Sequence, residues 1–198
     1  MPKNRVSTAG QLQQVAALAT VKTLEDFGCQ AGIKWVNDTF LNGKKISGCL
    51  CELLPSNSKE HNYLLVGIGL NVNMEQEELS KISRPATSIY AETLQKTNVE
   101  GVLESLSFYV QNYFSRLIHG DNKKLNEEIN EALLFKNHEI EFETSYGDTL
   151  RGKLIGVNVN GDLMFEGWDK KLRRVMKMKS GRILNVFGAS GEVLYKAN

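Results

Sequence analysis

The sequence lacks the features that mark membrane proteins, disulfide-rich proteins and strongly charged proteins. Its longest apolar stretches, such as residues 63–72, fall well short of the ~20 residues that a membrane-spanning helix needs, and no apolar signal region follows the polar start. Charge of one sign is also lacking, since 24 Lys and Arg nearly balance 23 Asp and Glu. Only three cysteines are present, which argues against a disulfide framework. We therefore expect a soluble, cytoplasmic protein with no membrane or nucleic-acid partner.

The composition is that of a folded domain. Of the 198 residues, 41% are hydrophobic and 24% are charged, close to the average of globular proteins. This length accommodates one ordinary domain, or one domain with a small second one.

Three stretches carry apolar residues at helical spacing. They predict helices over residues 11–27, 99–118 and 121–133, the last more polar than the others. From about residue 134 the apolar period changes from 3.6 to 2, and about five short strands follow in some 60 residues. We place a domain boundary there, with one domain over residues 1–133 and a second, a small β-barrel, over residues 134–198.

Strands are predicted over residues 33–36 and 45–54, with Asn42-Gly43 as a tight turn between them. We expect these two strands to pair. Cys49 and Cys51 alternate along the second strand, so they share one face, and small buried hydrophobic side chains are a better interpretation than metal ligands. A further β-rich stretch covers residues 63–73.

Three motifs follow one another in this first domain: Lys34-Trp35-Val36-Asn37-Asp38, then Asn42-Gly43-Lys44-Lys45-Ile46-Ser47-Gly48, then Val66-Gly67-Ile68-Gly69-Leu70-Asn71-Val72-Asn73. Their order and spacing strongly resemble those of biotin protein ligases, whose pattern is Lys-Trp-Pro-Asn-Asp, an Asn-Gly-Lys-Lys hairpin ending in Gly, and Gly-Ile-Gly-Ile-Asn-Val-Asn. Ala86-Thr87-Ser88 and a terminal β domain extend the resemblance over nearly the whole chain. Val36 replaces the usual proline.

The resemblance implies an α+β fold: a biotin/lipoate ligase-type catalytic domain, with a mixed sheet and helices, followed by a small SH3-like β-barrel. The family also places a Ser-Thr-Asn segment and a Gly-Arg-Gly-Arg loop upstream of the first helix. This sequence starts after them, so we expect an N-terminally truncated catalytic domain. A complementing N-terminal fragment, or a homo-oligomer that covers the uncovered apolar surface, is expected as a partner.

The implied activity is ATP-dependent biotin ligation. Biotin and ATP with Mg²⁺ give biotinyl-adenylate and pyrophosphate, and a lysine of the biotin carrier domain of a carboxylase then takes the biotinyl group. Because the first step joins an anionic carboxylate to an anionic phosphate, cations and backbone N–H groups are needed to offset the repulsion.

The resemblance assigns roles residue by residue. Lys45 is the candidate catalytic residue, reaching the carboxylate of biotin and the adenylate, and Gly48 and Cys49 are the other biotin contacts. Asp38 is the candidate Mg²⁺ ligand, directly or through water. The candidate ATP and adenylate contacts are Lys34, Trp35, Asn37, Asp38 and Asn71.

Without the motif context, these residues have ordinary structural interpretations. Lys45 is a solvated hairpin lysine, Asn37-Asp38 a turn pair, Gly48 a β-bulge glycine, and Trp35 is as well suited to the core as to adenine. The basic stretch Lys170, Lys171, Arg173, Arg174, Lys177, Lys179 and Arg182 suits a solvated strand face, docking of an acidic carrier domain, or contact with ATP phosphates across the domain interface.

Two alternatives to a complete ligase remain open. The first is a non-catalytic, ligase-derived protein that binds a nucleotide, a carrier domain or another chain. The second is a relative of lipoate ligases. The Lys-Trp-Val-Asn-Asp and Lys-Ile-Ser-Gly motifs favour the biotin branch over the lipoate branch.

Overall fold

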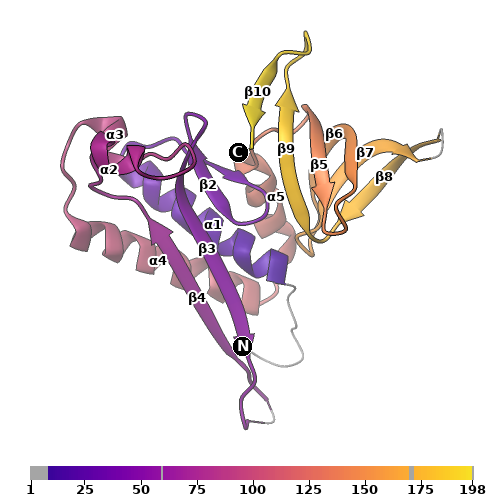
Figure 1. Cartoon of the computed structure of the whole chain (residues 1–198). Coiled ribbons are helices and arrows are strands. Elements are labelled where there is room, and N and C mark those ends of the chain that lie inside the picture. The colour runs from indigo at the N-terminus through magenta and orange to yellow at the C-terminus, as the bar shows by residue number, and fades with distance from the viewer. Residues whose placement is uncertain (1–8, 59, 170–171, 198) are drawn as a thin grey trace.

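A computed structural model describes residues 9–58, 60–169 and 172–197 (Figure 1). The expected helices are present, and two short helices that the sequence patterns did not indicate lie between them. The helices are α1 (Ala9–Asp26), α2 (Gln76–Ser80), α3 (Ile89–Thr93), α4 (Val99–Ile118) and α5 (Asn122–Ala132). None of the described helices is both long and apolar enough to cross a membrane.

Four strands in the first part of the chain form an antiparallel sheet in the order β1-β2-β3-β4. They are β1 (Gly32–Lys34), β2 (Asp38–Leu41), β3 (Lys44–Leu54) and β4 (Tyr63–Leu70). The long β3–β4 hairpin projects away from the helices in Figure 1.

The expected pairing of residues 33–36 with residues 45–54 is wrong. The strand β2 lies between β1 and β3 and pairs with both, and it is β2 that the Asn42-Gly43 turn joins to β3. Both turn residues have positive φ, 50° at Asn42 and 76° at Gly43, as a tight hairpin turn requires. β2 is only 4 residues long and begins at Asp38, within the expected Asn37-Asp38 turn pair, so its local pattern is too short to predict.

The C-terminal part forms a second antiparallel sheet in the order β10-β9-β5-β6-β7-β8. Its strands are β5 (Glu139–Thr144), β6 (Thr149–Val157), β7 (Leu163–Asp169), β8 (Leu172–Met178), β9 (Gly181–Phe187) and β10 (Val193–Lys196). Among the described residues β8 and β10 are the two edges, so the sheet does not close on itself. The α+β class is confirmed, and a closed SH3-like barrel is not.

The helix α1 is the centre of the molecule. Its apolar side chains are buried on several sides, because the first sheet packs on one side and α4 and α5 on another; the fully or almost fully buried ones are Leu12, Val15, Ala16, Ala17, Leu18, Ala19, Val21 and Leu24. Two of its buried polar groups are satisfied within the helix, with the hydroxyl of Thr20 donating to the Ala16 carbonyl (3.0 Å) and that of Thr23 to the Ala19 carbonyl (2.9 Å).

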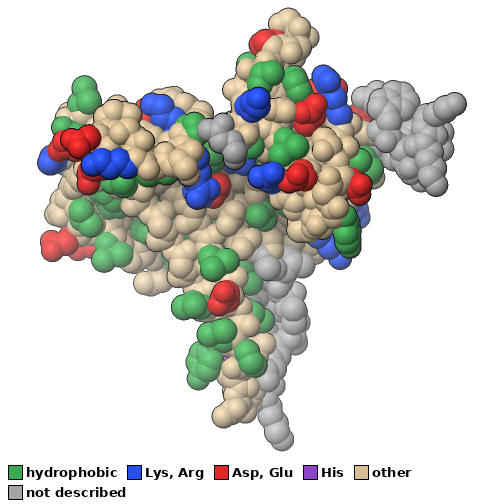
Figure 2. All heavy atoms as spheres, viewed as in Figure 1, with side chains coloured by type: hydrophobic (Ala, Val, Ile, Leu, Met, Phe, Trp, Pro, Cys, Tyr) green, Lys and Arg blue, Asp and Glu red, His purple; other side chains and the backbone are tan. Residues whose placement is uncertain are grey.

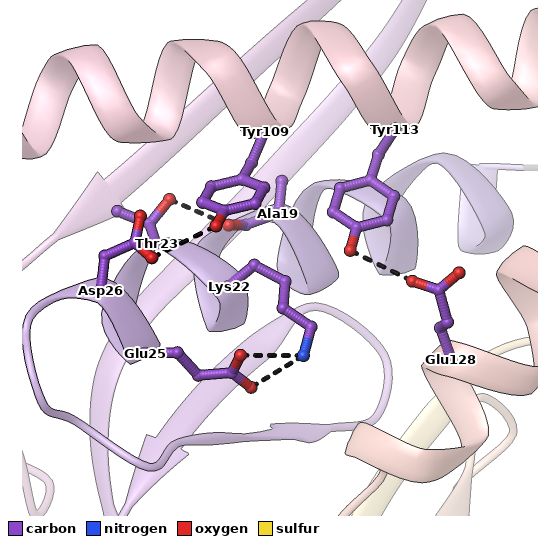
Figure 3. Close-up of polar contacts among 8 residues, drawn as sticks. All are labelled: Ala19, Lys22, Thr23, Glu25, Asp26, Tyr109, Tyr113 and Glu128. Carbon is purple, nitrogen blue, oxygen red and sulfur yellow. Dashed lines mark hydrogen bonds and ion pairs between the residues drawn. The ribbon is translucent and has the colours of Figure 1, made fainter.

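Polar contacts tie α4 to its neighbours at the edge of this core (Figure 3). The Tyr109 hydroxyl donates to Asp26 of α1 at 3.2 Å, and the Tyr113 hydroxyl donates to Glu128 of α5 at 3.1 Å. Burial, and after it the charge of Glu128, raise the pKa of Tyr113, so this hydroxyl stays a donor. Arg116 also binds Glu128, at 2.6 Å.

The second sheet meets the N-terminal end of α1 through the turn at Gly161. The carbonyl oxygen of Gly161 accepts two hydrogen bonds, from the side-chain amide of Gln14 at 2.7 Å and from the indole of Trp35 at 3.0 Å. One buried cluster includes residues of α1, the first sheet and the second sheet, with the ring centroids of Trp35 and Phe142 5.7 Å apart. The core is therefore continuous across residue 133, and the division at that residue stays a prediction.

We expect Gly161→Ala to destabilise the protein much more than Gly147→Ala, although the backbone has a positive φ at both glycines. A Cβ at Gly161 would lie 2.5 Å from the backbone nitrogen of Gln11, and its φ is +82°, whereas Gly147, with φ +87°, has nothing within 4 Å. Gly147→Ala should cost only the left-handed backbone penalty of about 1 kcal/mol, and Gly161→Ala about 3 kcal/mol. Urea unfolding of the two variants measures the difference; equal losses would contradict this packing.

Candidate functional site

The β2–β3 hairpin brings two candidate residues into contact. The ammonium group of Lys45 forms an ion pair with the carboxylate of Asp38, and both side chains are about four-fifths buried, with exposed fractions of 21% and 19%. A register shift between Thr39 and Phe40 moves Lys45 opposite Phe40, while Asp38 lies opposite Gly48. This register shift therefore places Lys45 and Asp38, which are seven residues apart, on the same face of the β2–β3 hairpin.

The backbone of Lys45 is held from its other side by a segment distant in sequence. Its N–H donates to the carbonyl of Pro85 at 3.0 Å, and its carbonyl accepts from the N–H of Thr87 at 2.9 Å. Ala86 thus forms an isolated parallel bridge with Lys45. Lys45 lies between β2 and this segment, and its position is fixed by both.

A cavity of about 640 Å³ opens beside the ion pair. Part of its wall is bare backbone, because three of its residues are the glycines Gly48, Gly67 and Gly69. Gly48 and Gly69 lie directly opposite each other in the pairing of β3 with β4. We call it the glycine-floored cavity; its walls are completed by Asn37, Asp38, Lys45, Ile46, Ser47, Cys49, Leu50, Leu70, Asn71, Ile82, Arg84 and Ala86. The volume is in the range of about 300–1,000 Å³ that small-molecule sites have.

Gly48 is needed by the ion pair itself. A Cβ there would lie 2.8 Å from the Lys45 ammonium nitrogen and 3.1 Å from a carboxylate oxygen of Asp38. The expected role was to leave room for a ligand. The geometry shows in addition that the absent side chain leaves room for Lys45.

Asn71 lines the cavity, but its amide group also has a structural partner. Its side-chain nitrogen donates to the carbonyl of Thr87 at 2.9 Å, and its backbone N–H donates to that of Ile46 at 3.0 Å. Asn71 therefore connects β3 to the segment that holds Lys45. Its contact with an adenylate stays a prediction.

Asn37 and Cys49 bind each other across the sheet. The N–H of Cys49 donates to the Asn37 carbonyl at 3.0 Å, and the Asn37 amide donates to the Cys49 carbonyl at 2.6 Å. Because that N–H is already used, the structure gives no support to a hydrogen bond from it to biotin. Both residues line the glycine-floored cavity.

The thiol of Cys49 points to the opposite face, where it donates to the Gln13 carbonyl of α1 at 3.0 Å. Cys51 shares that face, and each residue is 5% exposed, as the alternation predicts. All three cysteines are free. Burial raises the pKa of Cys49 to about 12 and that of Cys51 to about 11, from an ordinary 9.0.

Two candidates lie away from the glycine-floored cavity. Trp35 is 3% exposed and packs in the core with its indole on Gly161, which agrees with the core interpretation of this residue. Lys34 lines a separate, smaller cavity together with Asp38. Asp38 and Arg84 line both cavities.

The described residues contain no group of three or more His, Cys, Asp or Glu side chains placed to hold a metal ion. Mg²⁺ at nucleotide sites is held by one or two carboxylates, with phosphate oxygens and water as the remaining ligands. A single carboxylate such as Asp38 fits that arrangement, and its role as a ligand stays a prediction.

Sequence reasoning missed Arg84 and Ile82, which line the cavity from the segment after α2. No spacing rule connects them to Lys45, because a β-bridge over some 40 residues brings them together. The nearby Ala86-Thr87-Ser88 was the only sequence signal for this segment.

Comparison with known proteins agrees with the motifs. The model of the Biotin/lipoate A/B protein ligase family matches residues 2–71, which include all of the candidate residues. The bifunctional ligase/repressor BirA of Bacillus subtilis (strain 168) is 28% identical over 164 residues, which are 79% of this chain and 48% of that protein. Biotin–protein ligase 2 of Arabidopsis thaliana is 27% identical over 177 residues, covering 78% of this chain and 51% of the relative.

The fold has solved counterparts. The biotin protein ligase from Aquifex aeolicus, in complex with biotin and ATP, superposes with a TM-score of 0.73 at 24% identity, covering 92% of this chain and 74% of that one. This chain is biotin protein ligase-like. It spans about half the length of the curated relatives that it matches.

We expect Cys49 and Cys51 of this ligase-like chain to be unreactive in the folded state. Their raised pKa values keep both thiols protonated at pH 8, and burial blocks access, so thiol reagents should label them only after unfolding. Because the folded pKa values exceed the unfolded 9.0, the stabilisation they give is complete below pH 9 and is lost as pH rises toward 11 and 12. Timed labelling with a chromogenic disulfide at pH 8 checks this; fast native labelling of either cysteine contradicts it.

Proposed function

We propose that this chain carries the biotin-activating site of a biotin protein ligase. In the proposed first step a carboxylate oxygen of biotin bonds to the α-phosphorus of ATP and the bond from that phosphorus to the β-phosphate oxygen breaks, giving biotinyl-adenylate and pyrophosphate. In the second, a lysine amine of the biotin carrier domain of a carboxylase attacks the carbonyl carbon, and AMP leaves. ATP, biotin and Mg²⁺ are the proposed substrates and cofactor, and the cytoplasm is the proposed location.

The observation that carries this proposal is the Lys45–Asp38 ion pair beside the glycine-floored cavity. A fixed cation there would offset the repulsion between the carboxylate and the phosphate and stabilise the charge that develops during transfer. Asp38 holds the ammonium group, and the Pro85–Thr87 backbone holds the main chain of Lys45, so little reorganisation is needed when the ligand binds. The bare backbone of Gly48, Gly67 and Gly69 lets an extended ligand lie close to the sheet.

The charges of the cavity wall also favour an anion. Lys45 and Arg84 are its cations and Asp38 is its carboxylate, so the wall has a net positive charge. An adenylate has one phosphate charge, which matches this excess. The apolar wall residues Leu50, Leu70 and Ile82 suit the uncharged parts of such a ligand.

We expect Lys45→Ala to abolish tight binding of a biotinyl-adenylate analogue with a sulfamoyl link. Loss of one charge-assisted contact in a partly enclosed site costs about 1.5–3 kcal/mol, a tenfold to hundredfold weaker affinity. Gly48→Ala, which keeps the lysine but displaces it, should weaken binding in the same direction. Isothermal titration measures both.

Lys22→Ala is the matched control, since Lys22 also pairs with a carboxylate but lies on α1 outside the cavity. Unchanged affinity in Lys45→Ala and Gly48→Ala would overturn the assignment of Lys45. No binding of the analogue to the unaltered chain would favour the non-catalytic alternative, a ligase-derived binding or regulatory protein.

The proposal includes a partner on the first sheet, either a second copy of this chain or a complementing fragment with the upstream ligase segments. The strand β4 is the outer strand of that sheet, and one face of β3 and β4 has exposed apolar side chains, which are Leu50, Leu54, Tyr63 and Leu65. Figure 2 shows such side chains along the projecting hairpin. An open strand edge beside an apolar face is a template for pairing with another chain.

We expect the isolated chain to self-associate through this hairpin at tens of micromolar concentration. Leu65→Lys should shift it toward the monomer, because a charge would then be buried in the contact, whereas Leu103→Lys on α4, at a similarly exposed leucine, should not. Sedimentation velocity distinguishes the species. A monomer at every concentration would exclude the homo-oligomer and leave the complementing fragment.

A further inference from the structure

A carboxylate outside the glycine-floored cavity joins two segments that flank Lys45. Glu92 lies on the short helix α3, at the upper left in Figure 1, and is partly buried. One of its carboxylate oxygens accepts from the side-chain amide of Asn42 at 2.7 Å, and the other accepts from the hydroxyl of Thr87. None of these three residues lines the cavity, so the contacts are made away from the place where a ligand would lie.

Both partners of Glu92 bear on the position of Lys45. Asn42 forms the turn between β2 and β3 and comes three residues before Lys45 in the chain. Thr87, which is 1% exposed, donates its backbone N–H to the Lys45 carbonyl at 2.9 Å. Lys45 therefore lies between two segments that are bound to the same carboxylate.

The helix that carries Glu92 is itself attached to the first sheet. The N–H of Ile89 donates to the carbonyl of Asn71 at 3.1 Å, and the hydroxyl of Ser88 donates to the carbonyl of Met74 at 2.6 Å. α3 is thus held against the chain that follows β4. The backbone of Glu92 has a defined position relative to the sheet, and its side chain reaches the two segments from there.

A carboxylate suits these contacts better than a neutral side chain does. The amide nitrogen of Asn42 can only donate, and a carboxylate offers two acceptor oxygens. Within the part of the chain that the structure describes, Glu92 has no ion pair, so both oxygens serve neutral donors. The result of the contact is a fixed spacing between the Asn42 turn and Thr87, and not the neutralisation of a cation.

We propose that Glu92 is a positioning residue for Lys45. By holding the Asn42 turn against Thr87, it keeps the main chain of Lys45 in place, and the ammonium group then stays beside Asp38 at the cavity wall. This inference rests on the proposed function for its effect on ligand binding. The effect of Glu92 on the position of Lys45 does not depend on that function, so it can be tested without a ligand.

The test measures the rate at which the Lys45 amine of the full chain is acetylated by an N-hydroxysuccinimide ester, followed residue by residue with mass spectrometry. Glu92→Ala should raise this rate about tenfold, because the loss of two charge-assisted hydrogen bonds makes local opening more frequent. Glu92→Gln keeps one acceptor oxygen, and its amide can donate to the Thr87 hydroxyl, so it should raise the rate only about twofold. Lys22, which has an ion pair on α1, is the internal reference and should keep its rate.

Glu128→Ala is the matched control variant. The Glu128 carboxylate also joins two elements, since it accepts from the Tyr113 hydroxyl of α4 at 3.1 Å and binds Arg116. It lies on α5, however, and lines no part of the glycine-floored cavity. Its replacement should leave the acetylation rate of Lys45 unchanged.

Asn42→Gly is a second test variant, which keeps Glu92 and removes one of its partners. Glycine readily adopts the positive φ of this turn, so the hairpin is retained, and the rate at Lys45 should rise as in Glu92→Ala. If Glu92→Ala does not fold, Asn42→Gly carries the same test. Thiol labelling of Cys49, which is 5% exposed on the opposite face of β3, detects general opening and should stay slow in both variants.

A binding measurement separates positioning from a merely structural role. With Lys45 present, Glu92→Ala should weaken binding of the sulfamoyl adenylate analogue about fivefold to tenfold, as measured by isothermal titration. In the Lys45→Ala background the same change should have no further effect, because a residue that acts only through Lys45 has nothing left to position. A general loss of stability would weaken binding by the same factor in both backgrounds.

An unchanged acetylation rate of Lys45 in Glu92→Ala, or a rise that Cys49 labelling or Glu128→Ala shares, overturns the positioning role. Equal losses of analogue affinity with and without the lysine overturn it as well. A rise confined to Lys45, without any binding of the analogue to the unaltered chain, overturns the proposed function and leaves the positioning of Lys45 by Glu92 standing.

Discussion

The burial of α1 on several sides is the constraint on which the rest of the structure depends. The apolar side chains of α1 lie on several of its sides, so the first sheet, α4 and α5 all pack against it. Its end then needs a cover as well, and the Gly161 turn of the C-terminal sheet supplies one, with a carbonyl for Gln14 and Trp35. One buried helix therefore fixes both sheets relative to each other.

The two cavities are consequences of that arrangement. The glycine-floored cavity lies on the face of β3 and β4 that α1 does not cover, beside the Lys45–Asp38 pair. The smaller cavity that Lys34 lines lies where the end of the C-terminal sheet comes near β1 and β2. Packing far from either cavity thus sets the geometry of both, and for this reason a clash at Gly161 bears on the site as well as on stability.

Sequence patterns predicted the features that depend on residues close together in the chain. The long helix α4 matches its predicted bounds, and the face shared by Cys49 and Cys51 follows from strand alternation. The motif around Lys45 indicated the candidate site through its resemblance to the ligase motifs, and the role of that site stays a prediction. The place of β2, the contact of Trp35 with Gly161 over 126 residues and the bridge from Lys45 to Ala86 depend on tertiary packing, which no local period encodes.

The positions that break the usual rules of stability are the informative ones. A lysine buried among other cations and leucines exposed on an open strand both lower the stability of a lone chain, and neither is needed to cover α1. Lys34 lines the smaller cavity beside Asp38, while Leu50 lines the glycine-floored cavity and shares the exposed face of the β3–β4 hairpin with Leu65. In the proposed function, an apolar ligand or chain on that face covers the exposed leucines. The core thus accounts for the fold, and the departures from it mark the surfaces that binding completes.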